Sequence, residues 1–215
     1  MFTERLSHVA TLGRRFLGFF LLFLVAAPAA AQLPAPWVAA DVGSPALTGT
    51  TTYNSGTFTL AAGGDGIAGR SDSFHFVYQA ITGDTTIVAR IGTLIAANSA
   101  SKIGLMFRSS LSANAKHAFV YLDGNNLTGF YRRQVDGGRT VGTQGPAAQA
   151  PEWLAVKRAG NTFTAYTSVD GQSWQTIGSD TFAVGQSLYV GIAATARSTS
   201  ARLQATVTNV GFQQT

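Results

Sequence analysis

Aromatic rings and polar side chains recur at alternating positions along several short segments of this chain. Proteins that bind sugars combine these two kinds of group: aromatic faces cover the apolar C–H side of a pyranose, and amide, guanidinium and imidazole groups hydrogen-bond its hydroxyls. We predict one mixed aromatic and polar sheet face that binds a ligand. Its candidate residues are His75, Gln79, Arg90, Arg108, His117, Phe119, Tyr121, Tyr131, Arg133 and Trp153.

These residues also have structural interpretations, because a single sequence does not tell which sheet a strand joins. The alternatives are core packing for Phe119, Tyr131 and Trp153, an ordinary structural histidine at His75, and ion pairs of Arg90 and Arg108 with Asp72 or Asp84.

Two kinds of glycan chemistry can be compared with the residues present. A retaining glycosidase needs two carboxylates beside the scissile bond, but Glu152 is the only glutamate after residue 31 and most aspartates fall at predicted turns. A polysaccharide lyase needs a Tyr or His base and an Arg that neutralises a uronate. His75, Gln79, Arg90, Arg108, His117 and Tyr121 could supply these groups, so a lyase remains the enzymatic alternative.

No cofactor is predicted. Calcium could use loop oxygens from Asp65 or from Asp123 to Asn126, but no spacing of acidic oxygens approaches the six or more ligands that calcium takes. The segment Ser168 to Trp174 is similar to an Asp box but is one residue shorter and occurs once, so we interpret Asp170-Gly171 as a hairpin turn with Trp174 packed beside it.

The elements that must position these residues are short strands. Residues 72–90 alternate with period 2 on both sides of Thr82-Gly83-Asp84, which predicts an antiparallel hairpin. Further strands are expected at 56–60, 103–108, 117–122, 130–135, 153–158, 162–168, 173–177, 188–194 and 203–210. No segment sustains a helical period, and the breaks carry Gly, Asp and Asn. The predicted fold class is all-β, an antiparallel β-sandwich or jelly roll.

The N-terminus predicts export. Arginines precede an apolar run, and Ala29-Ala30-Ala31 follows it, as in a cleaved signal peptide over residues 1–31. An irregular segment is expected over 32–48 and a single sandwich domain over 37–212. We expect a secreted or periplasmic protein, and no membrane association after signal cleavage.

The composition of the chain limits the kinds of binding partner that we expect. The chain has no cysteine and a formal net charge of +5 over 215 residues. That charge is modest, and no basic run is interleaved with aromatic residues, so we expect no nucleic-acid partner. We expect a monomer with a poly- or oligosaccharide as its ligand.

Several stretches together resemble a known family. The succession DSFHFVYQ, TGDTTIVARI, SKIGLMFRSSL, AKHAFVYL, PEWLAVKRAGNTFTAYTSVDGQSW and YVGIAATA is similar to secreted bacterial modules with the concanavalin A-like lectin/glucanase sandwich, a domain type of unknown function often appended to exported carbohydrate-active enzymes. The resemblance implies a non-catalytic, glycan-related role. The predicted function is polysaccharide binding, with a lyase or a structural adaptor for a protein partner as alternatives.

Overall fold

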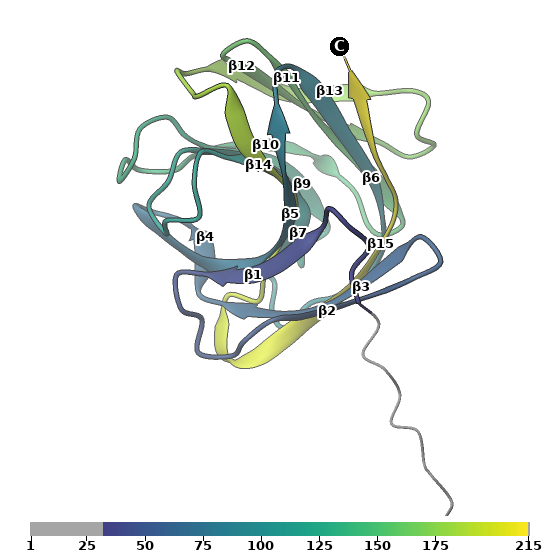
Figure 1. Cartoon of the computed structure of the whole chain (residues 1–215). Coiled ribbons are helices and arrows are strands. Elements are labelled where there is room, and N and C mark those ends of the chain that lie inside the picture. Colours follow the sequence, from purple (N-terminus) through teal and green to yellow (C-terminus); the bar gives the residue numbers. More distant parts are fainter. Residues whose placement is uncertain (1–31, 215) are drawn as a thin grey trace, which may run out of the picture.

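Alternating apolar positions form strands along almost the whole described chain. The computed structural model describes residues 32–214, and Figure 1 shows strands without helices. The predicted signal peptide lies outside the described residues. The strands are β1 (Val38–Val42), β2 (Thr50–Asn54), β3 (Thr57–Gly64), β4 (Gly66–Ala68), β5 (Ser71–Thr82), β6 (Thr85–Ile95), β7 (Lys102–Arg108), β8 (His117–Asp123), β9 (Leu127–Arg133), β10 (Val141–Ala147), β11 (Glu152–Ala159), β12 (Thr162–Ser168), β13 (Gln175–Thr181), β14 (Ser187–Thr195) and β15 (Ser198–Gln214).

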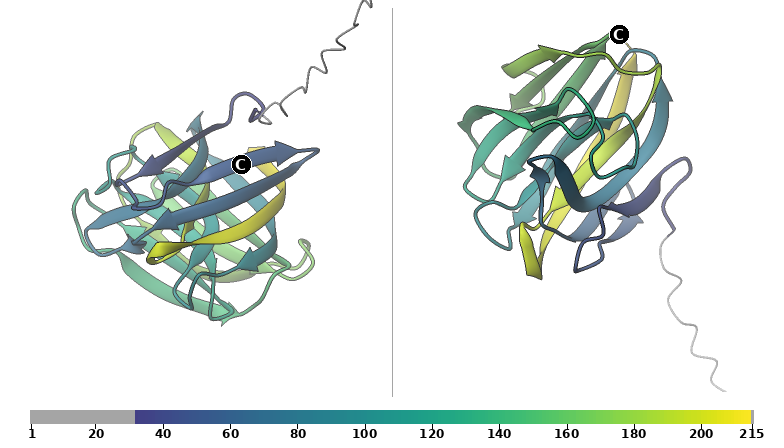
Figure 2. Two further views of the ribbon diagram at one scale, coloured as in Figure 1. Left: turned by 90° about the horizontal axis from the view of Figure 1, so that it is seen from below. Right: turned by 90° about the vertical axis from the view of Figure 1, so that its left-hand side faces the viewer.

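The strands form two antiparallel sheets (Figure 2). Sheet A has the order β1-β5-β14-β7-β8-β9-β10, and β4 pairs with β5 off this path. Sheet B has the order β13-β12-β11-β6-β15-β3-β2. The predicted all-β antiparallel sandwich is confirmed. Within the described range, no helix is long and apolar enough to cross a membrane.

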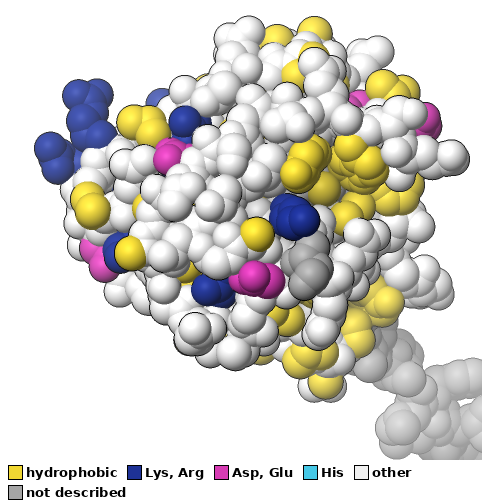
Figure 3. Space-filling model, turned by 90° about the horizontal axis from the view of Figure 1, so that it is seen from above, with side chains coloured by type: hydrophobic (Ala, Val, Ile, Leu, Met, Phe, Trp, Pro, Cys, Tyr) yellow, Lys and Arg dark blue, Asp and Glu magenta, His cyan; other side chains and the backbone are white. Residues whose placement is uncertain are grey.

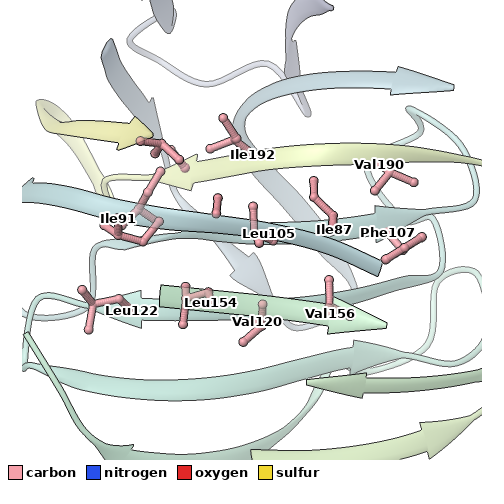
Figure 4. Packing of buried hydrophobic residues seen from close by; sticks show 14 of the residues in the cluster. Ile87, Ile91, Leu105, Phe107, Val120, Leu122, Leu154, Val156, Val190 and Ile192 are labelled. Carbon is pink, nitrogen blue, oxygen red and sulfur yellow. The ribbon is translucent and has the colours of Figure 1, made fainter. Parts of the chain in front are cut away.

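The core lies between the inner faces of the two sheets. Figure 4 shows Ile87 and Ile91 of sheet B in the same cluster as Leu105, Val120 and Ile192 of sheet A. All five side chains are fully buried. Because side chains alternate across a strand, these positions fix which residues of each strand point outward.

Sheet A is also apolar on its outer face. A second buried cluster there contains Phe74, Phe76, Met106 and Phe119. The strand β4 covers it with Ile67, and the loop after β7 packs Leu111 and Ala113 against it. This face is therefore closed by the chain itself over much of its area.

The predicted hairpin over residues 72–90 is wrong. β5 pairs with β1, β4 and β14 in sheet A, whereas β6 pairs with β11 and β15 in sheet B. The turn at Gly83, whose φ is +87°, carries the chain from one sheet to the other. The same turn residues can join two paired strands of one sheet or carry the chain between two sheets. Alternation within a strand does not show which strand it pairs with.

Four strands were not predicted. β1 lies inside residues 32–48, which were expected to be irregular, and β2, β4 and β10 lie in segments without a strand prediction. β10 has the sequence VGTQGPA, in which glycines and a proline interrupt any apolar alternation. It is held by its pairing with β9.

Candidate functional site

The predicted binding residues do not share one face. Six lie on the outer face of sheet A, namely Arg108, His117, Phe119, Tyr121, Tyr131 and Arg133. His75 and Gln79 lie on the side of β5 that faces sheet B, together with the core residue Val77. Arg90 and Trp153 are register partners on the outer face of sheet B. The expectation of one common surface is wrong. Because sheet A is apolar on both of its faces, the apolar side of one of its strands does not show which side of that strand faces the core.

The two arginines of sheet A are fully buried around one carboxylate. Arg108 Nη1 donates to Asp72 Oδ2 at 2.7 Å, and Arg133 donates from Nη2 to Oδ1 at 2.6 Å and from Nη1 to Oδ2 at 2.7 Å. Arg133 also bonds the carbonyl oxygens of Ala115 and Gly138. The ion pair between Arg108 and Asp72, one of the structural alternatives, is confirmed, and the cluster ties the covering loops to the sheet.

His117 lies in the same buried cluster. Its Nδ1 is 3.6 Å from Asp72 Oδ2, and the residue is 1% exposed. Burial is the main cause that lowers the pKa of His117 from 6.5 to about 3. Nearby Tyr121 is buried too, and burial raises the pKa of its hydroxyl. Neither group is placed to remove a proton from a bound polymer.

His75 connects three strands. Its Nδ1 lies 2.7 Å from Asp41 Oδ1 on β1, and its Nε2 lies 2.8 Å from Thr51 Oγ1 on β2. Asp41 also accepts the backbone N–H of Gly49. The structural alternative for His75 is confirmed. Asp41 escaped the sequence reasoning because it falls in a segment that was expected to be irregular.

An open groove with aromatic side chains lies on the outer face of sheet B. Trp153, Ala155 and Lys157 alternate outward on β11, and Tyr166 does so on β12. With Trp174 they line a groove of about 760 Å³. Figure 3 shows hydrophobic side chains gathered beside a basic side chain on one face of the molecule. The alternation that exposes Trp153 also predicts that Lys157 points outward, so the sequence held this signal.

Small residues form the floor of the groove. Ala155 and Val88 face each other across the β11–β6 pair, and Gly211 faces Val88 on the other side. A register shift in β15 between Thr208 and Gly211 follows from an inserted bulge. Because these small residues lie between larger side chains such as Trp153 and Tyr166, the surface is hollowed at this point.

The loop between β12 and β13 brings Trp174 to the groove. Asp170 Oδ1 accepts the backbone N–H groups of Gln172 and Ser173, both at 2.8 Å, and the hydroxyl of Ser168 at 3.0 Å. The bonds from Ser173 and Gln172 are the main reason that the pKa of Asp170 falls to about 2. The predicted β12–β13 hairpin is confirmed, with the carboxylate ordering the loop that carries Trp174.

A second hollow adjoins the groove. It has a volume of about 330 Å³, and Trp37, Tyr53 and Phe58 contribute to its lining. Asn209 and Val210 line both hollows. Each of the three tryptophans of the chain thus lines one of two hollows that share Asn209 and Val210.

Residues 32–214 contain no cluster of acidic side chains that would form a metal site. No group of three or more His, Cys, Asp or Glu side chains could hold an ion there. Asp123, a candidate calcium ligand, uses Oδ1 to accept the N–H groups of Asn125 and Leu127. This carboxylate thus has a structural role in its turn.

No protein-family model matches this chain, and no curated protein matches it in sequence. Solved structures do match its fold. A functionally unknown protein from Saccharomyces cerevisiae has a TM-score of 0.66 and 16% identity, over 82% of this chain and 96% of that one. Carbohydrate-binding module CBM66 from Bacillus subtilis has a TM-score of 0.53 and 17% identity, over 83% and 95%.

An enzyme chain contains the same fold. The GH43 protein BlXynB from Bacillus licheniformis has a TM-score of 0.56 and 14% identity, and the match covers 75% of this chain but only 34% of that one. At these identities the matches show the fold alone. Similar β-sandwiches therefore occur in a carbohydrate-binding module and within a larger GH43 protein.

Proposed function

We propose that this protein is a non-catalytic polysaccharide-binding module that acts outside the cytoplasm and binds its ligand in the groove on sheet B. The observation that carries the proposal is the pair of tryptophans, Trp153 and Trp174, beside Tyr166 in an open groove. Aromatic faces suit the apolar faces of pyranose rings. Trp174 is 36% exposed, so its ring is available to a ligand.

The composition of the groove supports binding rather than hydrolysis. No carboxylate and no histidine lines it, whereas a glycosidase uses two carboxylates that flank the bond to be cleaved. On sheet A, two of the groups that a lyase would use, Arg108 and His117, are buried in the cluster around Asp72. The fold shared with a carbohydrate-binding module agrees with this proposal.

Affinity electrophoresis in gels that contain xylan, β-glucan, mannan, polygalacturonate or alginate tests the proposal. We expect the protein to be retarded by at least one polymer, with no release of reducing ends or unsaturated uronates. Trp174→Ala should weaken the binding about fivefold, since removing one stacked ring costs on the order of 1 kcal/mol.

Tyr131→Ala is the matched control for the choice of face. Tyr131 is a partly exposed aromatic residue on sheet A, with its ring 4.7 Å from that of Tyr121. This variant should bind like the wild type, provided that its thermal unfolding shows it to be folded. Loss of binding in Tyr131→Ala but not in Trp174→Ala would move the site to sheet A, and new chain ends would contradict the non-catalytic role.

A further inference from the structure

Two basic side chains on the outer face of sheet B have no acidic partner within the described chain: Lys157, which lines the groove, and Arg90, which lies beside Trp153. No ion pair or side-chain hydrogen bond involves Lys157 or Arg90 among residues 32–214, and both are partly exposed. Other basic residues of the fold, such as Arg108 and Arg132, pair with aspartates. Both charges are thus available to a ligand that lies along the groove and reaches past Trp153.

The register places these two charges on either side of the small residues that form the groove floor. Trp153 pairs with Arg90, Ala155 with Val88, and Lys157 with Thr86. All of these residues point outward, because their strand neighbours face the core. Arg90 and Thr86 are four residues apart on β6, so the two cations are separated by roughly 13 Å along the strands.

Nearby carboxylates do not neutralise them. Asp170, in the loop that carries Trp174, accepts three hydrogen bonds from its own loop. Glu152 precedes Trp153 but is buried on the opposite side of β11, where Thr167 Oγ1 donates to its Oε1. The groove therefore combines apolar rings with unopposed positive charge.

We infer that the ligand of this groove is an acidic polysaccharide whose sugar units carry carboxylates, a polyuronate. The inference rests on the proposed function and names its substrate class. Tryptophan faces would pack on the pyranose rings, the guanidinium of Arg90 would pair with one carboxylate, and the ammonium of Lys157 would attract another. A neutral glycan would use the rings and leave both charges without partners.

Polygalacturonate and its fully methyl-esterified form provide the test, since they share one backbone and differ in charge. At low ionic strength we expect the acid form to bind at least tenfold more tightly than the ester, and added salt to reduce this difference. Lys157→Gln and Arg90→Gln should each weaken binding of the acid form about 2- to 5-fold, the range of a partly exposed ion pair, and should weaken binding of the ester by a smaller factor.

Arg139→Gln is the charge-matched control. Arg139 is an exposed residue in the loop between β9 and β10 of sheet A, so its loss should change neither binding constant. Equal binding of acid and ester would overturn the inference while the proposed function stands. Equal retention by dextran sulfate would also overturn it, by showing simple ion exchange or sulfate recognition. Binding to no polymer at all would overturn the proposed function itself.

Discussion

At the scale of single residues, Asp72 has the largest predicted effect on stability. Its carboxylate is the buried partner of both Arg108 and Arg133. Asp72→Asn keeps the shape but leaves two guanidinium charges buried without a counter-charge, which should cost about 3–5 kcal/mol in the free energy of unfolding. Urea denaturation measures this loss.

Asp180→Asn provides the comparison for Asp72→Asn. Asp180 pairs with Arg132 at 3.0 Å nearer the surface, so its loss should cost only about 0–1 kcal/mol. If the two variants lost similar stability, the buried cluster would not hold the covering loops as we describe.

His117 gives the protein a predictable sensitivity to acid. The folded state keeps this ring neutral down to about pH 3 because burial lowers its pKa, whereas the unfolded chain takes up the proton near 6.5. The unfolded state therefore binds more protons between these values, and stability is lost as the pH falls from 6.5 toward 3, by at most about 1.4 kcal/mol per pH unit.

The contribution of His117 is measured by comparing how steeply the free energy of unfolding depends on pH in the wild type and in His117→Phe. In His117→Phe the free energy of unfolding should depend less steeply on pH between 6.5 and 4 than in the wild type, whatever its absolute value. Urea titrations at several pH values measure both slopes. Parallel slopes would mean that His117 titrates alike in the folded and unfolded states.

At the scale of elements, the end of β15 shapes the groove. A side chain at Gly211 would meet no atom within 4 Å, so its space is open. Gly211→Leu should fill the floor beside Val88, weaken polysaccharide binding about tenfold or more, and leave the thermal unfolding temperature nearly unchanged. Isothermal titration calorimetry with the retained polymer measures the affinity.

Gly83→Leu is the control, because it makes the same change in side-chain size at a position outside the groove. Only its polysaccharide affinity is compared with that of Gly211→Leu. Gly83 lies in the turn between β5 and β6, where a side chain would also meet open space, although its φ of +87° adds backbone strain. If Gly211→Leu bound as tightly as the wild type, the groove floor would not contact the ligand.

At the scale of the whole molecule, the two outer faces differ in how far the chain itself covers them. The outer face of sheet A carries a second apolar cluster with β4 and a loop packed over it. The outer face of sheet B leaves its rings in an open groove. His75, bonded to β1 of sheet A and β2 of sheet B, links the two sheets at one edge. This division of the faces directs our proposal to sheet B.

The sequence by itself determined most of the strands and the fold class. Strict alternation in segments such as 103–108 and 117–122 identified β7 and β8, and the loop around Asp170 was recognised as a hairpin from its turn residues. The alternation of a strand depends on near neighbours in the chain, so local side-chain chemistry suffices to specify it. β10 escaped prediction because its order comes from pairing with β9.

Only the tertiary structure decided which candidate residues meet and which stay accessible. Alternation shows that Arg108 and Trp153 each point away from the core-facing side of their own strand. The packing of distant segments decides whether that outward side is covered. Arg108 is enclosed because Asp72 and the loop after β7 cover it, whereas Trp153 borders an open groove. The physical reason is that burial depends on contacts between residues far apart in the chain, and strand periodicity carries no record of those contacts.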